Sequence, residues 1–169
     1  MPLSRPAPPL RYVLTNDNKE RRAGRSFIAI KLEEVVMTKK FWISVVAVFV
    51  LSMFMGFIVH DTLLSPDYAK LASLFRPEAD AQKYLPAMLI AHLIFAAGFS
   101  WMYLRGRETK PFVGQGLRFG AAVAVLTTIP MYLIYYAVQP MPEALVIKQI
   151  VFDTVGTLVL GVVVAWINR

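Results

Sequence analysis

Four long apolar stretches alternate with polar segments along the chain. They are residues 41–60, 84–104, 119–138 and 144–167, and each holds 20 to 24 residues. A helix needs about 20 mostly apolar residues to cross the hydrocarbon core of a bilayer. Helices of a soluble bundle carry a polar outer face, and these stretches have too few polar positions to form one. The pattern therefore predicts four transmembrane helices, that is, an all-α integral membrane four-helix bundle.

The composition agrees with a membrane protein. Hydrophobic residues make up 57% of the chain and charged residues 17%, with a mean hydropathy of +0.53, whereas a soluble domain has roughly 45–50% and about 25%. The chain has no cysteine, which excludes a disulfide framework, a thiol nucleophile and a thiolate zinc site. We expect no cofactor and no nucleic-acid partner, because a nucleic-acid-binding protein would need a basic face on a folded soluble module.

The charges of the connecting segments predict an orientation. Lys39 and Lys40 precede the first stretch, and loop 105–118 has four bases and one acid. Loop 61–83 has three bases and four acids, and turn 139–143 has one acid and no base. Basic loops stay in the cytoplasm, and all three tryptophans lie near the same predicted ends, as interfacial aromatics do. We expect a bacterial inner-membrane protein with both termini in the cytoplasm.

The first outer loop contains a helical pattern of its own. Ser65-Pro66-Asp67 is typical of a helix start. Apolar and aromatic residues then recur at helical spacing, at Tyr68, Leu71, Leu74 and Phe75. The pattern predicts a short interfacial helix on the outer membrane surface. The alternative is a cap over the mouth of the bundle, and the sequence does not distinguish the two.

Residues 1–36 differ in character from the rest. They are basic and rich in proline, whereas Met37-Thr38-Lys39-Lys40 is a normal short start before a membrane helix. Glu33-Glu34-Val35 is encodable as GAG GAG GTN, which contains a bacterial ribosome-binding sequence at the usual distance from a start codon. We therefore expect the protein to start at Met37, with 1–36 a translated leader and 37–169 the membrane domain. The alternative is a disordered basic tail on anionic lipid.

Polar residues inside the predicted spans are the candidates for function, because they are costly there. Asp153 lies near the middle of the fourth span, where a charged side chain costs roughly 2.5–3.5 kcal/mol. Counting along the helices places several other polar residues on inward faces at comparable depth. The predicted polar layer consists of Asp153, His92, Ser52, Thr127, Thr128, Gln149 and Thr157. We expect Asp153 to face inward with a polar partner from this set.

Three interpretations of this layer remain open. In the first, Asp153 is structural and joins helices through hydrogen bonds. In the second, Asp153 and His92 relay protons within a carrier or a redox partner. The third is a metal site using His60, Asp61, His92 and Asp153. No ligand pair among them has diagnostic spacing, and His60 and Asp61 fit a solvated helix end, so we expect no metal.

Two other features of the spans concern packing. Small residues recur every four positions at 52/56, 116/120/124 and 157/161/165, which favours close helix contact or oligomerisation. Lys148 lies near the outer end of the fourth span, where its stem can carry the ammonium to the interface.

Three segments carry a resemblance to known proteins: His60–Tyr68, Gly114–Gly120 and Lys148–Asp153. In these segments the chain resembles small four-helix bacterial inner-membrane proteins grouped as domains of unknown function. The resemblance covers about residues 37–169 and implies a membrane protein of bacterial origin. It implies no activity and no catalytic residues.

The sequence thus favours a structural or accessory membrane subunit, a role without enzymatic activity. Its partners would be the lipid bilayer and a membrane protein or further copies of the chain. The alternative is a small proton-linked carrier or membrane enzyme that uses Asp153 and His92. A layer that opens into a polar pocket would favour the alternative, and a layer closed by Gly and Ala contacts would favour the first.

Overall fold

The structure, a computed structural model, describes residues 39–169. This part of the chain is all-helical, without a β-strand. Its helices are α2 (Lys39–Gly56), η1 (Phe57–Leu63), α3 (Ser65–Ala69), η2 (Ala72–Leu74), α4 (Glu78–Ala81), η3 (Gln82–Tyr84), α5 (Leu85–Gly106), α6 (Phe112–Leu126), α7 (Thr128–Val138) and α8 (Glu143–Ile167). The expected start at Met37 and the leader or tail over residues 1–36 lie outside the described residues.

Four helical segments are long and apolar enough to cross a membrane, which confirms the four predicted helices. They are Lys39–Leu63, Gln82–Gly106, Phe112–Val138 and Glu143–Ile167, of 25 to 27 residues each. The second and fourth agree closely with the predicted ranges. The first continues past residue 60 as the π-helix η1. The third begins at Phe112, so the predicted start at residue 119 is wrong.

The earlier start of α6 depends on Gln115, which ties the preceding loop to the first turn of the helix. Its Oε1 accepts a hydrogen bond from the backbone N–H of Glu108 at 2.8 Å. Its Nε2 donates to the carbonyl oxygens of Glu108 at 2.6 Å and Lys110 at 2.8 Å. Gln115 falls within the predicted loop 105–118, yet it satisfies loop backbone groups from within the helix.

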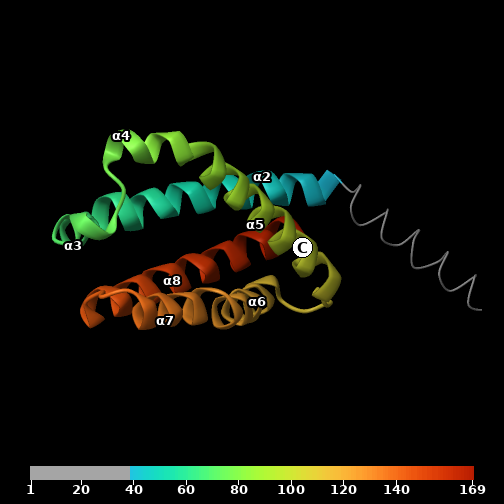
Figure 1. The fold of residues 1–169 in the computed structure, drawn as a ribbon. Helices are drawn as coiled ribbons and strands as arrows, with labels where there is room; N and C mark the ends of the chain where they lie inside the picture. The colour runs from blue at the N-terminus through green and yellow to red at the C-terminus, as the bar shows by residue number, and fades with distance from the viewer. Residues whose placement is uncertain (1–38) are drawn as a thin grey trace, which may run out of the picture. The chain divides into compact units, whose positions relative to one another are not determined.

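The third span is interrupted at Thr127, where the backbone angles are φ −121° and ψ −65°. Pro130 has no N–H to donate to the carbonyl of Leu126, and its ring crowds that carbonyl. The Thr127 hydroxyl also donates to the carbonyl of Val123 at 2.8 Å, a bond that tends to bend helices. The span therefore consists of two helices that follow one another along α8 (Figure 1).

Glycines bring α6 and α8 into the most extensive helix contact of residues 39–169. A Cβ built on Gly116 would lie 2.6 Å from the carbonyl oxygen of Gly161, and one on Gly120 would lie 2.7 Å from that of Thr157. The predicted close packing of the small-residue faces at 116/120 and 157/161 is thereby confirmed. At Gly56 the structure shows no such contact within the chain, because a Cβ there would meet nothing within 4 Å.

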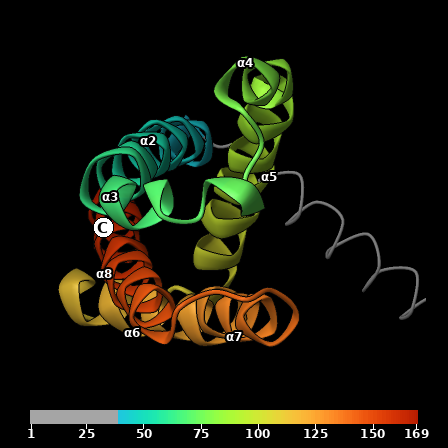
Figure 2. The ribbon, with the colours of Figure 1, turned by 60° about the vertical axis from the view of Figure 1, so that its left-hand side comes forward.

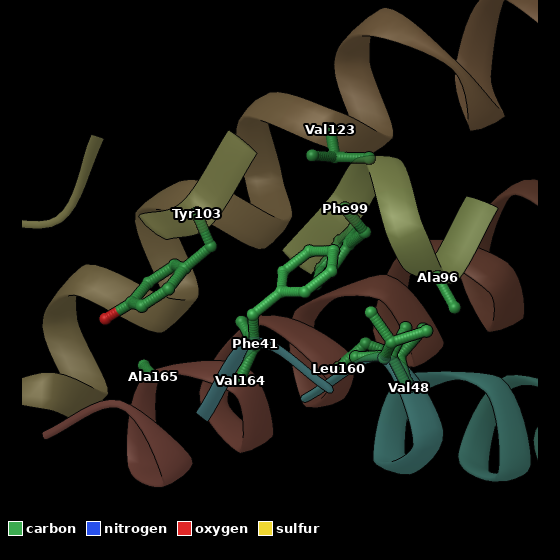
Figure 3. Packing of buried hydrophobic residues seen from close by; sticks show 10 residues of the cluster. Phe41, Val48, Ala96, Phe99, Tyr103, Val123, Leu160, Val164 and Ala165 are labelled. Atoms are coloured by element: carbon green, nitrogen blue, oxygen red, sulfur yellow. The ribbon is translucent and has the colours of Figure 1, made fainter. Parts of the chain in front are cut away.

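The main apolar core lies toward the end of the bundle that carries Arg169. It is formed by Phe41, Val45, Val48, Ala96, Phe99, Tyr103, Val123, Leu160, Val164 and Ala165. Figure 3 shows side chains from α2, α5, α6 and α8 meeting there. Phe99 is almost fully buried, and its ring packs edge-on against Phe119 with centroids 4.7 Å apart. This cluster holds α5 to the other helices at one end of the bundle.

Helix α5 has a different neighbourhood from the other spans. It packs chiefly along α2 and makes few contacts with α8 and α7. In Figure 2, which looks more nearly along the helices, α5 lies on the opposite side of the bundle from α8. Helices α5 and α7 are therefore not in extensive contact with each other.

The segment between η1 and α5, residues 64–84, covers the opposite end of the bundle, and we call it the capping segment. Helix α3 begins at Ser65 as predicted but ends at Ala69, and η2 is a separate turn, so the segment does not form one continuous helix. Tyr68 and Leu71 pack against a second apolar cluster that includes the fully buried Leu64 and the start of α8. The segment thus caps the bundle end formed by η1, α7 and α8.

Candidate functional site

A cavity of about 410 Å³ lies between the four spans. Helices α2, η1, α5, α7 and α8 contribute to its wall. The lining residues are Ser52, Met55, Gly56, Val59, His60, Ala91, His92, Phe95, Thr127, Thr128, Met131, Tyr132, Phe152, Asp153, Gly156, Thr157 and Leu160. We call it the Asp153 cavity. Its volume is in the range of sites for small molecules, about 300–1,000 Å³.

The structure brings six of the seven residues of the predicted polar layer to this wall. They are Ser52, His92, Thr127, Thr128, Asp153 and Thr157. Gln149 is the exception: it is buried one turn before Asp153 on α8, outside the lining. The layer therefore opens into a cavity and is not closed by contacts between small residues.

Asp153 faces inward, but its side-chain partners differ from the predicted set. The Tyr132 hydroxyl donates a hydrogen bond to Oδ2 of Asp153. Nε2 of His60 lies 3.4 Å from the same oxygen. Thr157 donates only to the backbone carbonyl of Asp153, at 2.8 Å. Neither Tyr132 nor His60 was among the expected partners. His60 lies within η1 and is only partly exposed, whereas Asp61 beside it is exposed, as expected of a solvated helix end.

Both missed partners carry a spacing signal. Tyr132 follows Thr128 by four residues, so the two share a face of α7. His60 follows Gly56 by four residues on the first span, on the face already assigned to the interior. The spacing does not show how far each side chain extends across the interior. The π-helical geometry of η1 and the break at Thr127 decide which of these side chains arrive at Asp153.

A row of polar contacts connects Asp153 to the capping segment through His60, whose Nε2 lies 3.4 Å from Oδ2 of Asp153. Nε2 of Gln149 donates to the Tyr68 hydroxyl oxygen at 2.9 Å. The Tyr68 hydroxyl lies 2.7 Å from Nδ1 of His60. The arrangement that uses every hydrogen has Tyr68 donating to Nδ1, because its oxygen already accepts from Gln149. His60 then carries its proton on Nε2, the nitrogen that faces Asp153.

His92 belongs to a second polar pair in the cavity. Ser52 Oγ donates to the carbonyl of Phe49 at 3.0 Å and lies 3.1 Å from Nδ1 of His92. Since the serine has a single hydrogen, His92 donates from Nδ1, which leaves its Nε2 as an acceptor. Within residues 39–169, no hydrogen bond or ion pair joins His92 to Asp153. The predicted Asp153–His92 relay is therefore not a direct contact.

The four residues weighed as a metal site do not form one cluster. His60 and Asp153 meet, whereas Asp61 and His92 do not join them. No group of three or more His, Cys, Asp or Glu side chains suited to a metal ion occurs in the described part of the chain.

Charged groups border the row at the capping segment. Lys148 Nζ donates to Oδ2 of Asp67 at 2.7 Å, so the lysine has a specific partner on α3 beyond the predicted reach to the interface. This hydrogen bond holds the pKa of Asp67 below its ordinary value. Burial, the largest cause, raises the pKa of Tyr68 above its usual value. Tyr68 is therefore a neutral hydroxyl that both accepts and donates.

No protein-family model, no curated protein sequence and no solved structure matches this chain. The function is therefore argued from the cavity and the residues that line it.

Proposed function

We propose that the chain is a four-span protein of a bacterial inner membrane, with both termini in the cytoplasm and the capping segment on the outer side. Large apolar side chains such as Ile94, Leu126 and Ile134 are exposed along the spans, as contact with lipid requires. The basic residues Arg105, Arg107 and Lys110, in and beside the connection between α5 and α6, lie at the end assigned to the cytoplasm. Reporter fusions after Arg107 should be cytoplasmic and fusions after Glu78 periplasmic. The opposite pattern would invert the assignment.

Within that membrane, the Asp153 cavity supports a proton-linked function, either transport or catalysis. The observation that carries this proposal is a carboxylate in the cavity wall, bonded by Tyr132 and adjacent to His60, with no Lys or Arg among the lining residues. A carboxylate in such surroundings is costly as a lone anion, so it gains a proton or a cation. An accessory subunit, the function that the sequence favoured, has no need of an open cavity around its most costly side chain.

The row of polar contacts from Tyr68 through His60 to Asp153 gives the proton a route. In the arrangement derived above, Tyr68 donates to His60, and His60 faces Asp153 with its Nε2 proton. A proton moves inward when Asp153 takes the Nε2 hydrogen and Nδ1 takes the hydrogen of Tyr68. A proton from water at the outer surface then re-forms the hydroxyl of Tyr68. Histidine suits this position because one of its ring nitrogens accepts a proton while the other donates one.

Infrared difference spectroscopy of the full chain in lipid nanodiscs tests the proposal. The wild type should show a protonated-carboxyl band that disappears as the pH rises, and Asp153→Asn should lack it. Asp80→Asn is the matched control, because Asp80 pairs with Arg76 and Lys83 on the capping segment, so this variant should keep the band. His60→Gln should slow the exchange of the band in deuterated water. A spectrum in which no Asp153 band responds to pH would leave the accessory-subunit function as the better one.

A further inference from the structure

The lining of the Asp153 cavity contains one carboxylate and no Lys or Arg side chain to balance it. Asp153 is the single acidic residue among the lining residues, and the only basic side chains in the lining are the imidazoles of His60 and His92. Among the described residues, Tyr132 and His60 both contact Oδ2 of Asp153. The carboxylate therefore has donors on one oxygen, while the cavity beside it contains no fixed positive charge. A ligand that replaces the proton has to carry a single positive charge of its own.

The rest of the wall indicates an organic cation. Aromatic rings of Phe95, Tyr132 and Phe152 line the cavity together with Met131 and Leu160. Aromatic faces attract cations, most strongly in sites that exclude water. A bare metal ion fits poorly, because Ca²⁺ or Mg²⁺ takes six or more oxygen ligands and this wall offers one carboxylate. The lining combines one anion with a large apolar surface, which matches an amphiphilic cation.

The side of the bundle between α5 and α7 gives such a ligand a way in. Ala91, His92 and Phe95 of α5 line the cavity opposite Thr128 and Tyr132 of α7. Helix α5 packs chiefly on α2 and makes few contacts with α7, and the lining residues Ala91 of α5 and Met131 of α7 are exposed. The entry from the lipid is therefore assigned to this side. A molecule that partitions into the bilayer reaches Asp153 from that side without crossing the capping segment.

We propose that the Asp153 cavity binds a lipophilic monovalent organic cation, which enters from the bilayer between α5 and α7 and exchanges with the proton on Asp153. This inference rests on the proposed proton-linked function and names its ligand class. When the cation binds, the O–H bond of the Asp153 carboxylic acid breaks and the proton leaves through His60 and Tyr68. When the cation departs, the same row returns a proton. One positive charge replaces another, so the cavity keeps the same net charge in both states.

Tetraphenylphosphonium is the probe, and tetraphenylborate, of the same shape and opposite charge, is its control. Both are measured by equilibrium binding to the full chain in nanodiscs, with protein-free nanodiscs as background. Tetraphenylphosphonium should bind about tenfold more tightly per pH unit over the range where the Asp153 acid is protonated, because one proton competes with one cation. Tetraphenylborate should not bind. Asp153→Asn should lose at least about tenfold in phosphonium affinity, whereas Asp80→Asn should match the wild type.

The possible outcomes distinguish a failure of the cation-binding inference from a failure of the proposed proton-linked function. If the infrared band of Asp153 titrates but tetraphenylphosphonium does not bind at any pH, the cation inference is wrong and the proton-linked function stands. Binding that is independent of pH, or equal for the phosphonium and the borate, also overturns the inference. These two comparisons use the wild type alone, so they decide the question even where Asp153→Asn fails to fold. If the band never titrates, the proposed function itself fails.

Discussion

The contact between α6 and α8 leaves no space for a methyl group at Gly116. A Cβ there would lie 2.6 Å from the carbonyl oxygen of Gly161, whereas ordinary contact begins at 3.4 Å. In Gly116→Ala the two backbones must therefore separate by about 0.8 Å, the difference between these distances. A gap of 0.5–1 Å forfeits roughly a quarter to a half of the dispersion energy of the atoms it separates. Overpacking of this kind costs about 1–3 kcal/mol.

Gly114→Ala is the matched control for this substitution. Gly114 lies on α6 two residues earlier, and its Cβ would meet nothing within 4 Å. Both variants gain the same helix propensity, about 1 kcal/mol for Gly to Ala, so the difference between them isolates the packing term. No glycine of residues 39–169 has positive φ, so alanine is compatible with the backbone at both sites.

The free energy of unfolding is measured in detergent micelles by titration with a denaturing detergent, followed by tryptophan fluorescence. We expect Gly116→Ala to be about 1–3 kcal/mol less stable than Gly114→Ala. Equal stability of the two variants would refute the close contact between α6 and α8. A loss of similar size in Gly114→Ala would instead show that the cost comes from the N-terminal part of α6 and not from the helix crossing.

Two further predictions concern the bonds around the cavity and the capping segment. Tyr132→Phe should lower the free energy of unfolding by about 1–3 kcal/mol, because it leaves Asp153 without its hydroxyl donor; Tyr136→Phe, an exposed position one turn later on α7, should change it little, and an equal loss in both would contradict the bond. Lys148 lowers the pKa of Asp67, so this pair stabilises the fold above the ordinary carboxyl pKa and loses that contribution as the pH falls through the lowered value. The melting temperature of Asp67→Asn should therefore fall below that of the wild type at neutral pH and converge with it in acid; a constant difference at all pH values would contradict the ion pair.

The fold was largely predictable from the lengths of the apolar stretches, because a stretch of about 20 apolar residues has few alternatives to a membrane helix. The bounds were less predictable where a polar residue serves the helix itself. Gln115 falls within the predicted loop 105–118, yet it stabilises the first turn of α6 through bonds to Glu108 and Lys110. Likewise, Gly116 weakens a helix by propensity but permits the contact with Gly161. Both effects come from tertiary partners that a local pattern does not contain.

The spacing of polar residues predicted six of the residues that line the cavity, but it did not predict the hydrogen bonds among them. A four-residue repeat identifies which side chains share a face, and that placed Ser52, His92 and Asp153 on inward faces. It does not say how far each side chain reaches across the interior. The pairing of Asp153 with Tyr132 and His60 depends on two departures from the regular α-helix, and the repeat assumes regularity.

These two departures lie on the wall of the same cavity, which links the irregular backbone to the candidate site. The π-helix η1 carries His60, and the break at Thr127 precedes the α7 turn that carries Tyr132. In lipid an irregular backbone is tolerated only where protein or a polar cavity satisfies its freed groups, and π-helical segments occur often at functional sites. Pro130 disrupts the regular helix at the break, and the break lies where the cavity wall carries polar side chains. A regular helix at either place would satisfy its own backbone better, but it would present a different face to Asp153. The backbone irregularities and the buried carboxylate are therefore best understood as parts of one site.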